Sequence, residues 1–266
     1  MQRIALASGG ELACDIHDFT KPWLPSEPLI FVHGFSKNRR FWYDWLPEFA
    51  SDYRVHNVDL RGHGESSPVD PDADFSLKAF ARDLVELLDA LGIERAHFIM
   101  AEFATSVAIE LAADYPSRVK SLVLPGFGYN WRAGAASPKA WAELLRKEGT
   151  AAWARETSQY RLPADTDPAL REWYIAQQSR MPASLLIRMF EFATTLDQTE
   201  RLPLVKAPSL VLYGSLAQQA TADSMALAEK LMPNAKFMRL EGMPFNVMTA
   251  SPTVCIESAK AFLRSL

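Results

Sequence analysis

The sequence has little cysteine and no long hydrophobic run, and both absences narrow the class of protein. Its 266 residues include only two cysteines, Cys14 and Cys255, with no C-x-x-C spacing and no cluster with histidine. Such usage predicts neither a disulfide framework nor a zinc site, and it is typical of a reducing cytoplasm. No segment approaches the roughly 18 apolar residues of a membrane span, and the first residues lack the pattern of a signal peptide. We therefore expect a cytoplasmic protein with no membrane partner.

Charge of either sign is not concentrated in any stretch. The formal net charge is -4, and no run of Lys and Arg could neutralise a line of phosphates, so nucleic acid is not an expected partner. With 48% hydrophobic residues, the chain can bury a full core as one large domain or as a domain with an inserted subdomain. The expected partner is a small-molecule substrate, with no metal and no cofactor. The sequence does not determine the oligomeric state, and a homodimer is one of the possible states.

Strand-like and helix-like segments alternate along most of the chain. Apolar runs that end in a turn, such as residues 27–34, predict buried strands, and the amphipathic stretch that opens at the capping candidate Ser76 predicts a helix. This alternation predicts an α/β fold with a mainly parallel sheet and helices on both faces. The pattern is only helical from about residue 129 to 201. We expect this segment to be a helical cap over a core formed by residues 1–128 and 202–266, roofing a site at the carboxyl ends of the strands.

Several motifs together resemble the α/β-hydrolase superfamily. They are "FVHGF" at residues 31–35, "DLRGHGESS" at residues 59–67, the strand-turn-helix segment that ends in "LAADYP", and the helical insertion. The likeness covers nearly the whole chain and is similar to compact bacterial members such as enol-lactone hydrolases and meta-cleavage C–C hydrolases. The resemblance implies the α/β-hydrolase fold and a G-x-S-x-G elbow that carries the nucleophilic serine.

The positions of the family's triad are occupied by other residues in this sequence. Members with a similar segment place the nucleophile fourteen residues before the proline of "LAADYP", and counting back from Pro116 reaches Glu102. A slip of one residue would put Phe103 there and leave no reactive group. The family's acid position falls on Ala217 and its histidine position on Phe245. The resemblance therefore implies a degenerate triad.

No histidine follows His97, so ordinary serine-hydrolase catalysis is not expected, because a serine hydroxyl needs a base. The superfamily also contains enzymes resembling haloalkane dehalogenases and epoxide hydrolases, whose elbow aspartate attacks carbon. These enzymes need a histidine to hydrolyse the ester intermediate, which disfavours the same route for Glu102. We expect instead that Glu102, desolvated by neighbours such as Met100, Phe103 and Phe245, moves a proton near neutral pH as a general acid or base.

The resemblance also implies other parts of the site. The backbone N–H groups of Phe35 and Phe103 map to the oxyanion hole, where they would stabilise an enolate or be blocked by Glu102 itself. Further residues are candidates for substrate binding, although His33 also fits a purely structural loop role and Arg39 a solvated helix start. These candidates are His33, Arg39, Trp131, Arg188 and Phe245.

Three functional interpretations follow from these residues. The favoured one is an atypical, cofactor-independent enzyme, a lyase, isomerase, decarboxylase or unusual hydrolase, in which Glu102 acts on a small aromatic or carboxylated metabolite. The second is a catalytically inactive pseudo-hydrolase that binds a small ligand or a partner. The third is a conventional hydrolase in which His33 reaches the elbow from its own loop.

Overall fold

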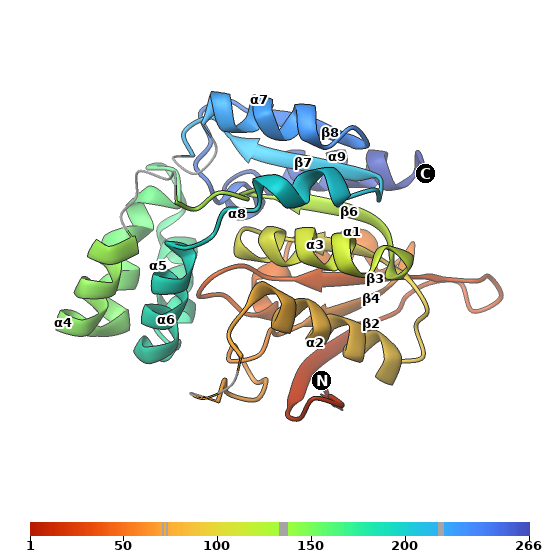
Figure 1. Ribbon diagram of the computed structural model, residues 1–266, viewed down its shortest axis with the longest axis horizontal. Helices are drawn as coiled ribbons and strands as arrows, with labels where there is room; N and C mark the ends of the chain where they lie inside the picture. The colour runs from red at the N-terminus through yellow and green to blue at the C-terminus, as the bar shows by residue number, and fades with distance from the viewer. Residues whose placement is uncertain (71, 73, 133–137, 218–220) are drawn as a thin grey trace.

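A single eight-stranded sheet has the order β1-β2-β4-β3-β5-β6-β7-β8 (Figure 1). The structure is a computed structural model that describes residues 1–70, 72, 74–132, 138–217 and 221–266. β1 pairs with β2 and β2 with β4 in antiparallel fashion, and the other neighbouring strands run parallel. The strands are β1 (Gln2–Ala5), β2 (Glu11–His17), β3 (Glu27–Val32), β4 (Tyr53–Val58), β5 (Ala96–Met100), β6 (Val119–Pro125), β7 (Ser209–Gly214) and β8 (Ala235–Leu240).

Helices cover both faces of this sheet, because its central strands bury side chains on both sides. In β3, Ile30 and Val32 pack in one core cluster with α2 and α3, whereas Leu29 and Phe31 pack in another with η1, α1 and α9. The expected mainly parallel sheet with helices on both faces is confirmed. The described helices are η1 (Arg39–Trp42), α1 (Leu46–Phe49), α2 (Leu77–Ala90), α3 (Phe103–Asp114), η2 (Pro116–Arg118), α4 (Pro138–Thr157), η3 (Ser158–Tyr160), α5 (Pro168–Gln178), α6 (Ala183–Ala193), η4 (Thr199–Leu204), α7 (Ala222–Leu231), α8 (Val247–Ala250) and α9 (Pro252–Leu263).

The only regular elements described between β6 and β7 are helices joined by turns and loops, apart from one isolated bridge between Asn130 and Asp197. The chain enters and leaves this segment side by side, since Gln198 N donates to Tyr129 O at 2.9 Å and Trp131 N to Leu196 O at 3.1 Å. Helices α4, α5 and α6 gather at one end of the molecule, on the left of Figure 1. The expected cap spans residues 129–201, of which 133–137 lie outside the described residues.

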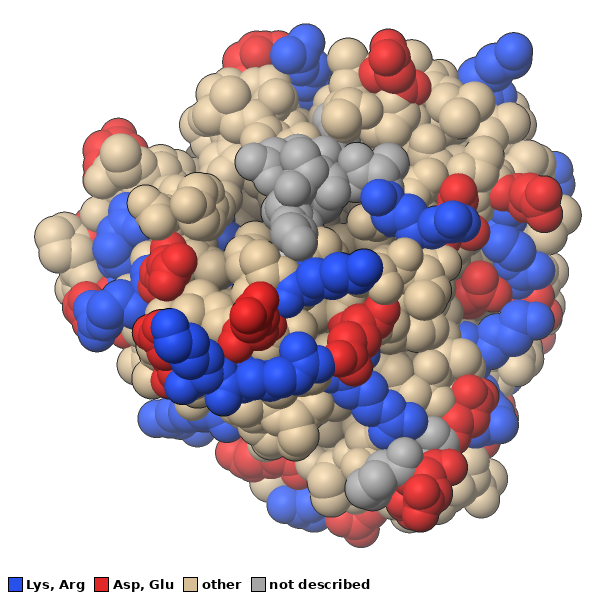
Figure 2. Space-filling view, turned by 60° about the vertical axis from the view of Figure 1, so that its left-hand side comes forward, with Lys and Arg blue, Asp and Glu red and all other residues tan. Residues whose placement is uncertain are grey.

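The surface carries charges of both signs. Figure 2 shows one face on which Lys and Arg side chains are interspersed with Asp and Glu. Many of these charges form exposed pairs, such as Arg155 with Glu172 at 3.1 Å, which contribute little to stability. In the ranges that the structure describes, no helix has both the length and the apolar character that a membrane crossing requires.

Three buried histidines make the stability of the fold depend on pH. His33, His56 and His63 are at most 2% exposed, and burial lowers their pKa from 6.5 to about 4, about 4 and about 3, respectively. Between about pH 6.5 and pH 4 these histidines bind protons in the unfolded chain but stay neutral in the folded chain. Their contribution to the free energy of unfolding is therefore fully present above about pH 6.5 and is lost as the pH falls towards 4. We expect the free energy of unfolding, measured by urea titration, to fall by roughly 3 kcal/mol per histidine over this range.

The His56→Phe variant is the matched control for this pH dependence. Neither ring nitrogen of His56 has a hydrogen-bond partner in the described part of the chain, so phenylalanine keeps the packing and removes the titrating group. Its free energy of unfolding should change less with pH than that of the wild type. Equal stability of the wild type at pH 7 and pH 4 would show that these rings are not held neutral.

Candidate functional site

A cavity of about 800 Å³ lies where the central strands end and the helices between β6 and β7 begin. Its walls come from the loop after β3, the turn after β5, the loop after β8, and η3 and α5 with the chain that joins them. Ligands of open parallel sheets bind beyond the carboxyl ends of the strands, so this cavity is the candidate active site.

Glu102 occupies the sharp turn between β5 and α3, at one wall of the cavity. Its φ of 56° and ψ of -117° are strained for a residue with a side chain, as in the elbow that exposes a nucleophile at the end of a strand. Two glycines make room for it. A Cβ on Gly34 would lie 2.6 Å from the Glu102 Cβ, and a Cβ on Gly126 would lie 3.1 Å from the Glu102 Cγ. The backbone therefore holds the carboxyl group in a fixed place.

Glu102 is paired with a buried lysine. Lys37 Nζ donates to Glu102 Oε1 at 2.6 Å, and the lysine side chain is completely buried. Burial lowers the pKa of Lys37 below its ordinary value, and the charge and hydrogen bond of Glu102 offset this lowering only in part. The sequence led us to expect apolar surroundings for Glu102, whereas the structure places an ammonium group there. Lys37 supplies the counter-charge that a buried carboxylate requires.

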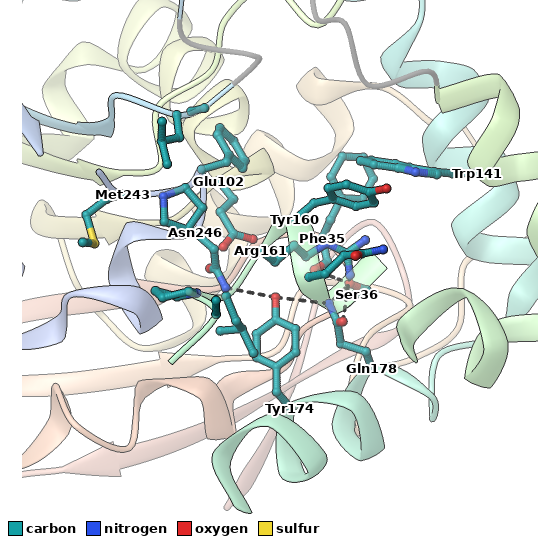
Figure 3. Close-up of a pocket in the computed structure, with 18 of the residues that line it drawn as sticks. Phe35, Ser36, Glu102, Trp141, Tyr160, Arg161, Tyr174, Gln178, Met243 and Asn246 are labelled. Atoms are coloured by element: carbon teal, nitrogen blue, oxygen red, sulfur yellow. Dashed lines mark hydrogen bonds between the residues drawn. The ribbon is translucent and has the colours of Figure 1, made fainter. Parts of the chain in front are cut away.

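Polar contacts continue from this pair along one side of the cavity (Figure 3). Lys37 Nζ also donates to Asn246 Oδ1, and Asn246 Nδ2 donates to Tyr174 Oη at 3.0 Å. Gln178 Nε2 donates to Ser36 Oγ at 2.6 Å. Burial raises the pKa of Tyr174, so its hydroxyl stays protonated over the working pH range. These contacts fix the orientation of Lys37 relative to Glu102.

Two backbone N–H groups beside Glu102 have no acceptor. Neither the N–H of Phe35 nor that of Phe103 donates a hydrogen bond within the described ranges of the chain. These are the groups that the family resemblance assigns to the oxyanion hole. The Glu102 carboxylate accepts a hydrogen bond from Lys37 and none from these two N–H groups, so it does not block them.

The structure brings four of the expected site residues together at the cavity: Phe35, Glu102, Trp131 and Phe245. The rings of Trp131 and Phe245 meet at a centroid distance of 5.5 Å, and Trp131 Nε1 donates to Ser106 Oγ at 2.9 Å. The Phe103 side chain is fully buried beneath the cavity, against the Phe35 ring.

The other three expected residues do not line the cavity. Leu60 N donates to His33 Nε2 at 3.1 Å and His33 Nδ1 lies 2.9 Å from Gly34 O, so both ring nitrogens are engaged by the backbone. This arrangement leaves His33 no free nitrogen to act as a base at the elbow. Arg39 and Arg188 have partners outside the cavity.

Arg39 is buried in an ion-pair network below the loop. Its Nε lies 2.7 Å from Asp15 Oδ2, its Nη2 lies 3.2 Å from Glu65 Oε2, and its Nη1 pairs with Asp59. The Arg188 guanidinium lies 4.5 Å from the Phe75 ring centroid, and its Nη1 donates to Asp70 O at 3.2 Å. Arg39 and Arg188 therefore form contacts with other parts of the protein, outside the cavity.

Several polar residues of the site were missed in the sequence, among them Lys37, Asn246 and Arg161. Lys37 lies two positions beyond Phe35 in the same loop, and Asn246 directly follows Phe245. These adjacent positions are the only signal that could have pointed to them. Arg161 lies in the helical segment, whose packing on the core no local pattern predicts.

The chemistry that this site can offer is narrow. None of the five histidines lines the cavity, and Ala217 is part of its wall. No group of three or more His, Cys, Asp or Glu side chains in the described ranges is arranged to hold a metal ion. The groups suited to act are a carboxylate at the elbow, an ammonium group behind it and two backbone donors beside it.

The fold agrees with a comparison of the sequence with known families. Residues 27–244 match the family model described as "alpha/beta hydrolase fold". The chain belongs to the α/β-hydrolase family.

Similar members of this family include hydrolases. The RutD protein of Stutzerimonas stutzeri is 29% identical over 214 residues, which cover 74% of this chain and 76% of the relative. The 3-oxoadipate enol-lactonase 1 of Acinetobacter baylyi is 24% identical over 246 residues, which cover 89% of this chain and 85% of the relative. The crystal structure of the enol-lactonase from Burkholderia xenovorans LB400 matches with a TM-score of 0.87 and 20% identity, over 99% of this chain and 100% of that one. At this identity the structural match shows the fold alone.

Proposed function

We propose that this α/β-hydrolase is an enzyme that uses Glu102 as a general acid and base rather than a serine nucleophile. Its substrate is a small carboxylated or aromatic metabolite, and its reaction is a proton-transfer reaction such as isomerisation, decarboxylation, lysis or an atypical hydrolysis. One observation carries the proposal: the Glu102 carboxyl group faces the cavity from a strained turn, with Lys37 Nζ at 2.6 Å. A strained position that holds a charged group is typical of a functional site.

In the proposed mechanism, Glu102 removes a proton from a carbon atom next to a substrate carbonyl group. The resulting enolate oxygen accepts hydrogen bonds from the N–H groups of Phe35 and Phe103, which have no acceptor within the described chain. Lys37 balances the carboxylate before the transfer and holds it in position through Asn246. Glu102 then returns the proton to the substrate. A well-placed general base is worth about 10² to 10⁴-fold in rate.

The proposal includes a degenerate triad and a cap. Ala217 and Phe245 lie at the wall of the cavity, and neither side chain can take up or orient a proton. Residues 129–201 are the proposed cap, whose Trp131, Arg161 and Tyr174 contribute to the cavity wall. Water activation by histidine, the step that completes ester hydrolysis in the family, has no residue to perform it here.

Ester hydrolysis distinguishes this proposal from nucleophilic chemistry. We expect the wild type, Glu102→Gln and Glu102→Ser to hydrolyse p-nitrophenyl acetate and butyrate at the same background rate, because none of them has a histidine in the cavity wall to activate serine or water. The measurement is the rate of p-nitrophenolate release. Wild-type turnover that disappears in Glu102→Gln would mean that the carboxylate takes part in ester hydrolysis, and it would contradict the expectation that this site hydrolyses such esters only at the background rate.

A second candidate function is that of a pseudo-hydrolase that binds a small ligand without converting it. It is favoured by the fact that Glu102 already has an internal partner in Lys37, as a purely structural ion pair would. Saturable binding of a ligand in the cavity, with no chemical change of that ligand over hours, would support this function. Turnover that depends on Glu102 would exclude it.

A further inference from the structure

Arg161 is an arginine in the cavity wall that forms no ion pair with a carboxylate of the described residues, although the charge of Glu102 acts on it from a longer distance. It follows η3 and lies among the cavity residues drawn in Figure 3. Its guanidinium carbon lies 4.2 Å from the centroid of the Trp153 ring and 5.6 Å from that of Trp141. Its Nη1 donates to Gln178 Oε1 at 2.8 Å, and the Tyr174 hydroxyl is a further partner. Within the described residues, no Asp or Glu oxygen lies within ion-pair distance of this side chain.

A half-buried arginine without an acidic partner in contact is unusual, because desolvating a charge is costly unless another charge compensates it. Arg161 is partly exposed and forms part of the cavity wall. Burial lowers the pKa of Arg161, although an arginine remains protonated at neutral pH in proteins. The guanidinium is thus a charged group whose planar donors are only partly used by neutral neighbours.

The charges around the cavity do not cancel. The Glu102 carboxylate is matched by Lys37, which leaves Arg161 as an excess positive charge. Asp165 also contributes to the cavity wall, but it is exposed, where solvent and salt screen its charge. The interior of the cavity therefore favours a ligand with one negative charge.

The other side chains of the cavity wall indicate what kind of apolar group the ligand carries. Aromatic side chains surround Arg161 and Glu102, and a flat apolar group could stack against them. These side chains are Phe35, Trp131, Trp141, Trp153, Phe190 and Phe245. A volume of about 800 Å³ is ample for a molecule with one ring and a short side chain.

We infer that Arg161 binds the carboxylate of the substrate, and that the substrate class is small aromatic monocarboxylates. The planar guanidinium matches a carboxylate in a two-point contact, and stacking on Trp153 keeps the donor plane oriented. The ring of the ligand lies against the aromatic wall, and its acidic carbon faces Glu102. This inference rests on the proposed function for the chemistry that follows binding, whereas the binding itself does not require turnover.

Calorimetric titration with phenylacetate and its neutral analogue phenylacetamide tests the inference. The wild type should bind phenylacetate at least tenfold more tightly than phenylacetamide, because only the acid can pair with the guanidinium. Arg161→Gln should lose this preference and bind both compounds with the affinity of the amide. Arg155→Gln, which removes an exposed arginine paired with Glu172 on the outer surface, should behave as the wild type does.

Two controls separate the possible failures. The melting temperature of Arg161→Gln reports whether the variant folds, and removing an uncompensated charge should not lower it. Equal binding of acid and amide by the wild type, binding of neither, or an unchanged preference in Arg161→Gln would each overturn the role of Arg161. Binding that prefers the acid in an enzyme that never exchanges or converts any aromatic acid would leave Arg161 in place and refute the acid-base function of Glu102.

Discussion

Replacing Lys37 by methionine is expected to lower the free energy of unfolding by roughly 3–5 kcal/mol. The substitution leaves the Glu102 carboxylate buried at 6% exposure without its counter-charge, and it removes a donor from Asn246 Oδ1. Breaking one side of a buried pair costs far more than the pair itself contributes, because the remaining charge is neither solvated nor neutralised. Urea titration at pH 7 measures the effect.

The double variant Lys37→Met/Glu102→Gln identifies the cause of this loss. If the two side chains act as a pair, removing both charges should recover most of the stability, and the double-mutant cycle should give a coupling of at least about 2 kcal/mol. Lys147→Met is the matched control, since Lys147 is exposed and its partner Glu148 lies 3.8 Å away. It should change stability by no more than about 0.5 kcal/mol. Additive effects of Lys37→Met and Glu102→Gln would show that Lys37 and Glu102 are energetically independent.

The position of the elbow could be predicted because the spacing known from the resembling family applies to a short, continuous segment of the sequence. The apolar strand before Glu102, the helix after it and Pro116 beyond the helix determine the spacing, and the structure places Glu102 at the strained turn with φ 56°. The same kind of local information predicted the parallel sheet and the N-cap residue of helix α2. Ser76 Oγ accepts from Ala79 N at 3.2 Å, as a helix cap does.

The surroundings of Glu102 could not be predicted, because they depend on contacts between distant segments. Lys37 is 65 positions from Glu102 and 209 positions from Asn246, and a lysine in a polar loop is normally solvated. The direction in which a loop side chain points depends on the packing of the whole domain. For the same reason Arg39 fits a solvated helix start in the sequence but lies buried against Asp59.

The side chains of the helical segment between β6 and β7 that line the cavity could not be predicted either. Its aromatic residues fit helical spacing in the sequence, and which of them face the cavity depends on how the helices lie on the core. Trp131 lines the cavity, whereas Arg188 packs on Phe75 away from it. Arg161, which carries the inferred carboxylate site, gives no sequence signal because its partners Trp153 and Gln178 come from different helices.

The second large effect concerns proton transfer itself. A general base that loses its carboxylate should lose about 10² to 10⁴-fold in rate, since the amide of glutamine has nearly the same shape and no affinity for a proton. The Glu102→Gln variant keeps a side-chain oxygen that can accept from Lys37 Nζ, so the geometry around the elbow is preserved. It leaves Lys37 without a negative partner, and a melting curve confirms that the variant is folded before rates are compared.

The most direct test of the central claim is deuterium exchange at carbon, followed by proton NMR in D2O. Phenylpyruvate, pyruvate and acetoacetate each carry a carboxylate and protons next to a ketone, and their uncatalysed exchange gives the baseline. The wild type should exchange the protons of at least phenylpyruvate well above this baseline, and Glu102→Gln should fall by about 10² to 10⁴-fold. Exchange by Glu102→Gln at the wild-type rate, or no exchange above the baseline by the wild type, would contradict the role of Glu102 as the proton-transfer group.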